Sequence, residues 1–172
     1  HSEYSLMDGS IVIKDLVKEV KKRGHTHVAL TDRGVMHGVV EFYLEAKKAG
    51  LTPIVGCEIY HQRQVAHFSH KGYKQSEDPF HLVCLAKNTQ GYKNLTKLAS
   101  SAFRGNNLKQ VPIVSGQDLD QHCSELVALS SSLKGELAYL VSLLRQQSGQ
   151  GPLVFDFEHP VLGPICQELE NH

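Results

Sequence analysis

The sequence predicts an α/β fold in which strands alternate with covering helices, as in a layered sheet or a β/α barrel. Two observations carry this prediction. Short apolar runs of strand length recur along the chain, and segments with a helical apolar stripe separate them. With 172 residues, of which 41% are hydrophobic, the chain has the size and composition of one globular domain. We therefore expect residues 1–172 to form a single domain.

The first half of the chain predicts two helices, each followed by a strand. Residues 11–23 place apolar side chains at the spacing of one helical face, residues 39–49 repeat that pattern, and a glycine ends each segment. The short apolar runs 27–31 and 52–60 are typical of buried strands. Because strands that alternate with helices usually pair in parallel, this order predicts parallel strands covered by helices.

The second half predicts buried strands at 81–86 and 126–130, with a helix near 92–103 between them. Residues 61–79 are polar and lack periodicity, so we expect an insertion loop on the surface. The other expected elements, in chain order, are a loop at 106–115, a short helix or turn at 117–123, a helix at 135–145, a linker at 146–152 and a weak strand near 167–170.

The charges balance, because Lys+Arg and Asp+Glu both number 18. The chain as a whole therefore has no net charge that would favour a nucleic acid or a membrane surface. The basic clusters at 21–23 and 47–48 lie at the ends of predicted helices, where they complement the helix dipole. We expect Tyr92 and Phe103 to pack in the core rather than to stack on bases, since no basic groove accompanies them in the sequence.

None of the four cysteines, Cys57, Cys84, Cys123 and Cys166, forms a C-x-x-C pair. The first two lie in apolar runs, which favours buried free thiols and a reducing, cytoplasmic compartment. No apolar run approaches the roughly 18 to 20 residues of a membrane span, so we expect no membrane partner. The chain begins at His1 without a methionine, and we expect it to be part of a longer protein.

Polar residues cluster at the ends of the predicted strands. Asp32 follows the first strand, Glu58 lies near the end of the second, and His81 opens the third. In a β/α barrel such residues converge on one rim. Together with His1 and Asp8 they supply imidazole and carboxylate groups, which zinc, manganese and iron sites use. Spacing alone leaves a structural role open, since histidine can bond the backbone and aspartate can cap a turn.

Six sequence blocks carry a family resemblance. They are HSEYSLMDG (1–9), ALTDRGVMHG (29–38), EFYLEAKKAGLTPIVGCE (41–58), HLVCLAKNTQGYKNL (81–95), LSSSLKGE (129–136) and ELENH (168–172). The chain resembles the PHP (polymerase and histidinol phosphatase) domain of bacterial DNA polymerase III α subunits, and the fourth block resembles the polymerase branch in particular. The resemblance implies a distorted, seven-stranded, TIM-like β/α barrel whose rim can hold three metal ions. We expect an incomplete barrel, because β/α barrels typically need about 250 residues.

The resemblance also implies a set of metal ligands for a divalent ion such as zinc or manganese. The implied ligands are His1, Asp8, Glu58, His81 and His172. Two positions depart from the family pattern. Arg33 stands in place of a histidine, and a guanidinium cannot coordinate a metal. Ser132 stands in place of a cysteine, and a hydroxyl is a poorer ligand than a thiolate.

Arg33 has two interpretations. It can replace the charge of the metal and pair with Glu58 or Asp8, or it can be an outward-facing surface residue. We expect the first, because the neighbouring carboxylates would otherwise crowd like charges into one pocket.

The resemblance implies part of a DNA-directed DNA polymerase, a nucleotidyltransferase of DNA replication whose polymerising aspartates lie outside these residues. Implied partners are the remainder of the polymerase α subunit, DNA through that protein, and a proofreading exonuclease subunit. The altered ligands favour a structural and interaction domain with a degenerate metal site. Two alternatives stay open: a metal-dependent phosphoesterase, acting as a 3′–5′ exonuclease or pyrophosphatase, and a free-standing phosphatase of the histidinol-phosphate type.

Overall fold

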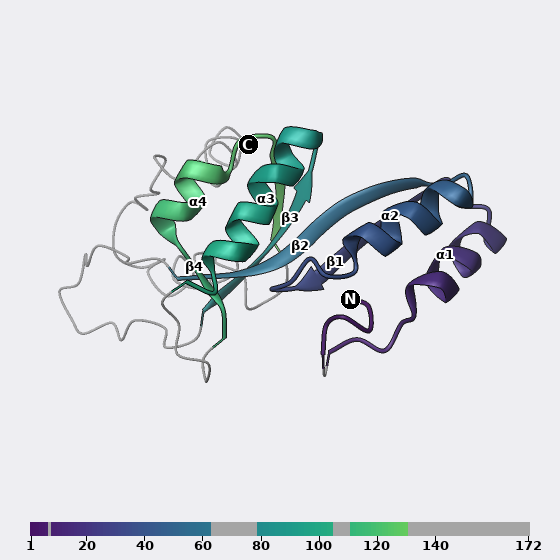
Figure 1. The fold of residues 1–172 in the computed structure, drawn as a ribbon, viewed down its shortest axis with the longest axis horizontal. Coiled ribbons are helices and arrows are strands. Elements are labelled where there is room, and N and C mark those ends of the chain that lie inside the picture. The colour runs from purple at the N-terminus through teal and green to yellow at the C-terminus, as the bar shows by residue number, and fades with distance from the viewer. Residues whose placement is uncertain (7, 63–78, 105–110, 131–172) are drawn as a thin grey trace, which may run out of the picture.

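The computed structural model describes residues 1–6, 8–62, 79–104 and 111–130 (Figure 1). In chain order these contain α1 (Ile13–Lys22), β1 (His27–Arg33), α2 (Val39–Lys48), β2 (Thr52–Gln62), β3 (Phe80–Ala86), α3 (Thr89–Ser101), β4 (Ile113–Ser115), α4 (Gly116–His122) and β5 (Leu126–Ser130). The predicted helices and strands up to residue 130 are all present. Sequence reasoning missed β4, which lies in a segment predicted as loop and is only three residues long.

The strands form one sheet in which β2 is central. β1 pairs with β2 in parallel, β4 pairs in parallel with the last residues of β2, β3 runs antiparallel to β2, and β5 runs antiparallel to β3. The prediction of parallel strands, which concerned the first two strands, is therefore confirmed by β1 and β2, whereas β3 adds an antiparallel neighbour. Strand direction depends on pairing between distant segments, so the periodicity of a single strand does not encode it.

Within the described residues the sheet has five strands and does not close into a barrel. A mixed α/β architecture is thus confirmed, whereas seven-stranded closure is not shown. The predicted helix 135–145, the linker 146–152 and the strand near 167–170 lie outside the described residues, as does most of the predicted loop 61–79. No helix in the described parts of the chain is both long enough and apolar enough to cross a membrane.

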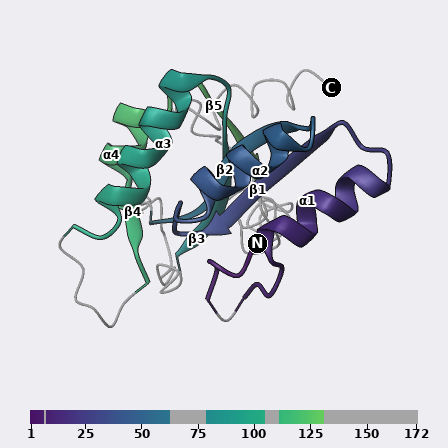
Figure 2. The same cartoon turned by 45° about the vertical axis from the view of Figure 1, so that its right-hand side comes forward.

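The four helices pack on one face of the sheet as two adjoining clusters (Figures 1 and 2). One cluster joins α1 and α2 to β1, with Ile13, Phe42 and Leu30 fully buried or nearly so. The other joins α3 and α4 to β2 and β3, with Leu98 and Leu119 at its centre. Burial of these amphipathic faces stabilises the helical layer on that side of the sheet.

Two predictions of burial are wrong. Tyr92 and Phe103 are 38% and 56% exposed, because they lie on the side of α3 that faces away from the sheet. In β5, which pairs only with β3 among the described strands, Val127 and Leu129 are 42% and 46% exposed. An apolar side chain therefore did not indicate a core position in either element.

The prediction of buried free thiols is confirmed for Cys57 and Cys84, which lie opposite each other on β2 and β3. Burial in this apolar layer raises the pKa of each thiol to about 12. Cys123, at the end of α4, is only partly buried. Because the thiolate is the reactive species, the first two cysteines should be inert in the folded protein.

We predict that in a folded Cys166→Ser variant only one thiol, that of Cys123, reacts fast with a disulfide reagent at pH 8. Cys57 and Cys84 should react only after a denaturant is added. Unfolded thiols ionise near pH 9, so the unfolded state binds fewer protons than the folded state above that pH, and the free energy of unfolding should fall as the pH rises further. Three fast thiols in the native protein would contradict the packing described.

A buried carboxylate ties the N-terminal segment to the end of β1. Asp32 is 1% exposed and accepts hydrogen bonds from the backbone N–H of Ser2, from Ser2 Oγ at 2.8 Å and from Ser5 Oγ at 2.7 Å. Ser5 Oγ also accepts from the backbone N–H of Arg33 at 3.0 Å. Buried donors and acceptors are thus satisfied together, and the segment that carries His1 is fixed in place.

We predict that Asp32→Ala lowers the free energy of unfolding by about 3 kcal/mol, because two buried serine hydroxyls lose a charged acceptor. Urea unfolding followed by circular dichroism measures the change. The matched control is Asp120→Ala on the exposed side of α4, which should change stability by less than about 0.5 kcal/mol. Equal effects of the two substitutions would show that the hydrogen bonds from Ser2 and Ser5 to Asp32 do not stabilise the fold.

Candidate functional site

The polar cluster lies on the face of the sheet opposite the helices. In the strand register Arg33 lies beside Glu58, and Tyr60 lies beside His81. Because successive side chains of a strand point to opposite faces, these four residues project on one side. The antiparallel direction of β3 brings its first residues to the carboxyl end of β2, which is where β1 also ends.

Glu58 is the centre of the cluster and is only 4% exposed. One carboxylate oxygen, Oε2, lies 2.6 Å from His1 Nε2, and the other, Oε1, lies 2.7 Å from His81 Nδ1. Tyr60 packs edge-on against the His81 ring, with centroids 4.7 Å apart. Both oxygens of the buried carboxylate are therefore engaged by imidazoles.

Arg33 supplies a permanent positive charge to the same cluster. Its Nη1 lies 2.8 Å from Asp8 Oδ2, and its Nε lies 3.7 Å from Glu58 Oε2. Partial burial acts to lower the pKa of Arg33, but the neighbouring Glu58, Tyr60 and Asp8 together raise it above its ordinary value. The expected pairing of Arg33 with these carboxylates is present, so Arg33 is not an outward-facing surface residue.

Sequence reasoning missed Tyr60. Burial raises the pKa of its hydroxyl, with Asp8 and Glu58 acting in the same direction and Arg33 opposing them. The residue therefore stays a neutral phenol in the ordinary range of pH. The signal that could have found it is strand alternation, since Tyr60 follows Glu58 by two positions and must share its face.

The structure brings together four of the five ligands that the resemblance implies: His1, Asp8, Glu58 and His81. Asp8 contacts Arg33, which in turn lies near Glu58, whereas the two histidines contact Glu58 directly. His172 and the altered position Ser132 lie outside the described residues.

These residues do not fit a bound metal as they stand. Within the described ranges, no three His, Cys, Asp or Glu side chains are arranged so that they could hold an ion together. Both oxygens of Glu58 are occupied by imidazoles, and the guanidinium of Arg33 brings a positive charge into the same site. Arg33 offers a divalent cation no lone pair, and its positive charge offsets part of the attraction that Asp8 and Glu58 would exert on that cation.

Comparison with known proteins identifies the family to which the chain belongs. The profile of the PHP domain matches residues 1–158. The DNA polymerase III α subunit of Borreliella burgdorferi is 34% identical over 172 residues, which is 100% of this chain and 15% of that protein. The α subunit of Helicobacter pylori strain 26695 is 38% identical over 139 residues, or 81% of this chain and 11% of that protein. The chain thus spans about 15% or less of the length of these two relatives.

Among solved structures, an amidohydrolase from Chromobacterium violaceum is similar over 86% of this chain and 72% of its own, with a TM-score of 0.47 and 12% identity. The sequence matches carry the assignment, since the family profile covers most of the chain. They also include the residues that build the cluster around Glu58. The chain belongs to the PHP domain family and is homologous to the N-terminal region of DNA polymerase III α subunits.

Proposed function

We propose that this chain is the N-terminal PHP domain of a bacterial replicative DNA polymerase, in which an arginine neutralises the rim carboxylates in place of metal ions. One observation carries the proposal: the guanidinium of Arg33 lies between Asp8 and Glu58, at 2.8 and 3.7 Å. The domain then acts as a structural and interaction module of the larger protein. The two relatives described above are α subunits, which supports this origin over a free-standing phosphatase.

The charge balance of the cluster explains why an arginine can keep such a rim intact. Asp8 and Glu58 would repel each other in a partly buried site without a cation. Arg33 provides that cation permanently, and its planar group can address two carboxylates at once. The carboxylates therefore keep their arrangement, while position 33 no longer provides a metal ligand.

The partners follow from the parent protein. We propose that the domain packs against the remainder of the polymerase α subunit in the cytoplasm, meets DNA through that subunit, and can dock a proofreading exonuclease subunit. Residues 1–172 form one domain in this proposal, with the insertion 61–79 and the linker 146–152 as connecting segments. Nucleotidyl transfer belongs to other parts of the protein.

One observation favours a second candidate, a metal-dependent phosphoesterase acting as an exonuclease or pyrophosphatase. His1, Glu58 and His81 converge within hydrogen-bond distance, and two imidazoles with a carboxylate are a common ligand set. This candidate requires Arg33 to leave the site, because its charge opposes a cation there.

We predict that the protein purified without a chelator carries less than one equivalent of zinc, manganese or iron by elemental mass spectrometry. Arg33→His combined with Ser132→Cys should gain metal, because two coordinating groups return to the positions at which the family has them. The matched control is Arg23→His with Ser100→Cys, which adds the same groups at exposed positions on the helical side of the sheet.

Stoichiometric metal in the unsubstituted protein would overturn the proposal and favour the phosphoesterase, with hydrolysis of single-stranded DNA ends and of pyrophosphate as the assays that follow. Equal metal gain in the rim variant and in its control would show that the rim has no special geometry for an ion.

We also predict that Arg33→Met lowers the free energy of unfolding by about 2 to 3 kcal/mol, because it leaves the buried Glu58 carboxylate without its cation. Urea unfolding measures the change. The control is Arg23→Met, which removes an exposed pair with Glu19 at 2.9 Å and should cost less than about 1 kcal/mol. The proposal fails if Arg33→Met costs no more than Arg23→Met.

A further inference from the structure

Among the four described helices, α3 is the one that carries lysines without any acidic residue, and an exposed tyrosine lies beside those lysines. Exposed and buried residues alternate in pairs along the helix, which separates one outer face from the sheet side. The outer face, continued through the turn after the helix, carries Tyr92, Lys93, Thr96, Lys97, Ser100, Phe103 and Arg104. No part of this surface is used by the rim cluster.

The outer face of α3 is positively charged without local compensation from its own helix. Lys93 and Lys97 are one turn apart, and α3 contains no acidic residue. Arg104 lies just after the end of α3 and extends the row of cations beyond the helix. Among the described residues, one ion pair involves these cations and joins Arg104 to Asp118 of α4 at 3.9 Å, with the arginine side chain 74% exposed. So long and solvated a pair holds the guanidinium weakly and leaves it accessible to another anion.

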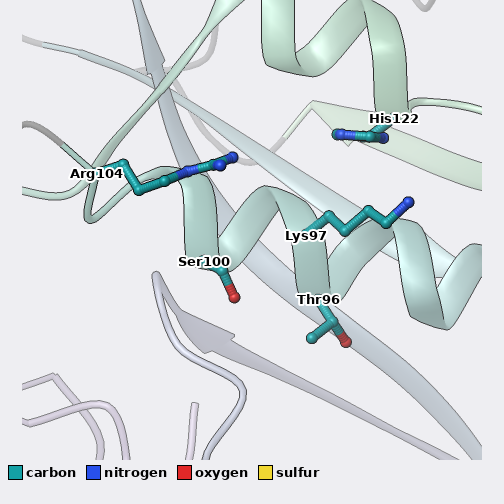
Figure 3. Close-up of a pocket in the computed structure, with 5 residues that line it drawn as sticks. All are labelled: Thr96, Lys97, Ser100, Arg104 and His122. Atoms are coloured by element: carbon teal, nitrogen blue, oxygen red, sulfur yellow. The ribbon is translucent and has the colours of Figure 1, made fainter.

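A groove of about 490 Å³ runs beside these cations. It is lined by Thr96, Lys97, Ser100 and Arg104 together with His122 at the end of α4. Figure 3 shows Lys97 and Arg104 on the side of α3 that faces His122, and the hydroxyls of Thr96 and Ser100 on its other flank. The groove is therefore open to solvent, and its two cationic side chains, Lys97 and Arg104, lie along one wall.

Exposed aromatic rings border the hydroxyl flank. Tyr92 is 38% exposed and Phe103 is 56% exposed. Tyr92 lies on the exposed side of α3 one turn before Thr96, and Phe103 lies in the turn that follows the helix. A row of cations with solvent-exposed rings alongside is the arrangement that binds a flexible polyanion whose units also carry flat apolar faces.

We propose that the outer face of α3 binds single-stranded nucleic acid, with Lys93, Lys97 and Arg104 along the phosphate backbone and with Tyr92 and Phe103 under the bases. The binding does not select a sequence, because stacking and charge attraction accept any base. It also stands apart from the proposed role of the rim, so either conclusion can fail without the other.

Comparison with α2 shows that an exposed tyrosine beside a lysine does not by itself make a helix surface positively charged. It also has an exposed tyrosine beside a lysine, Tyr43 and Lys47, whose Nζ lies 5.7 Å from the ring centroid. However, α2 carries Glu41 and Glu45 among its ten residues, and these offset its lysines. The two helices therefore offer a matched pair of surfaces that differ in net charge.

The test is fluorescence anisotropy of labelled oligothymidylate with the 172-residue chain over a range of salt concentrations. Lys93→Glu with Lys97→Glu should weaken binding by at least about tenfold and reduce the slope of log affinity against log salt by about 1. The control, Lys47→Glu with Lys48→Glu on α2, makes the same change of charge and should leave both quantities nearly unchanged. Circular dichroism verifies that each variant is folded.

Stacking has a separate readout. Tyr92→Ala and Phe103→Ala should each weaken binding by up to about tenfold without changing the salt slope, whereas Tyr43→Ala should have no effect. A duplex of equal length should bind more weakly, since its bases are already stacked. An oligouridylate measured in parallel identifies whether DNA or RNA is preferred.

Three outcomes would overturn the proposal. The first is equal binding by the α3 variants and the α2 controls. The second is duplex binding as tight as single-strand binding with no effect of Tyr92→Ala or Phe103→Ala. The third is competition by inorganic phosphate, at matched ionic strength, as strong as that by unlabelled oligonucleotide, which would assign the groove to a single small anion.

Discussion

The negative charge of Glu58, held away from water at the end of β2, is the constraint on which the rim depends. A buried carboxylate requires partners for both of its oxygens and a compensating positive charge. His1 and His81 supply the partners, and Arg33 supplies the charge. Each of these three residues comes from a different segment. Contacts with Glu58 therefore help to position the start of the chain, β1 and β3 relative to one another.

This constraint links the sheet topology to the chemistry of the site. If β3 ran parallel to β2, its first residue would lie at the far end of the sheet from Glu58. The antiparallel pairing instead places His81 beside Tyr60, two register positions from Glu58 and on the same face of the sheet. The Asp32 hydrogen bonds act in the same way on the N-terminal segment and bring His1 within 2.6 Å of the glutamate.

The sequence predicted the helices and most of the strands because apolar periodicity is a local property, and each of these segments shows it over several residues. It could not predict the direction of β3 or the existence of β4, which depend on contacts between distant segments. The resemblance located His1, Asp8, Glu58 and His81, and the charge argument anticipated the pairing of Arg33. Tyr60 was missed because the candidate site residues were chosen among metal-ligand types, which do not include tyrosine. Tyr92 and Phe103 were misplaced because aromatic content does not by itself specify a core position.

The separation of the two faces of the sheet has a consequence for substitutions at the rim. Core residues such as Cys57 and Leu82 point toward the helices, whereas Arg33 and Glu58 point away from them. Substitutions at the rim therefore leave the packing of the helical layer largely untouched, and additivity is expected between mutations on the two faces. A substitution at position 33 can thus change the charge and chemistry of the cluster around Glu58 while the helical layer on the other face keeps its packing.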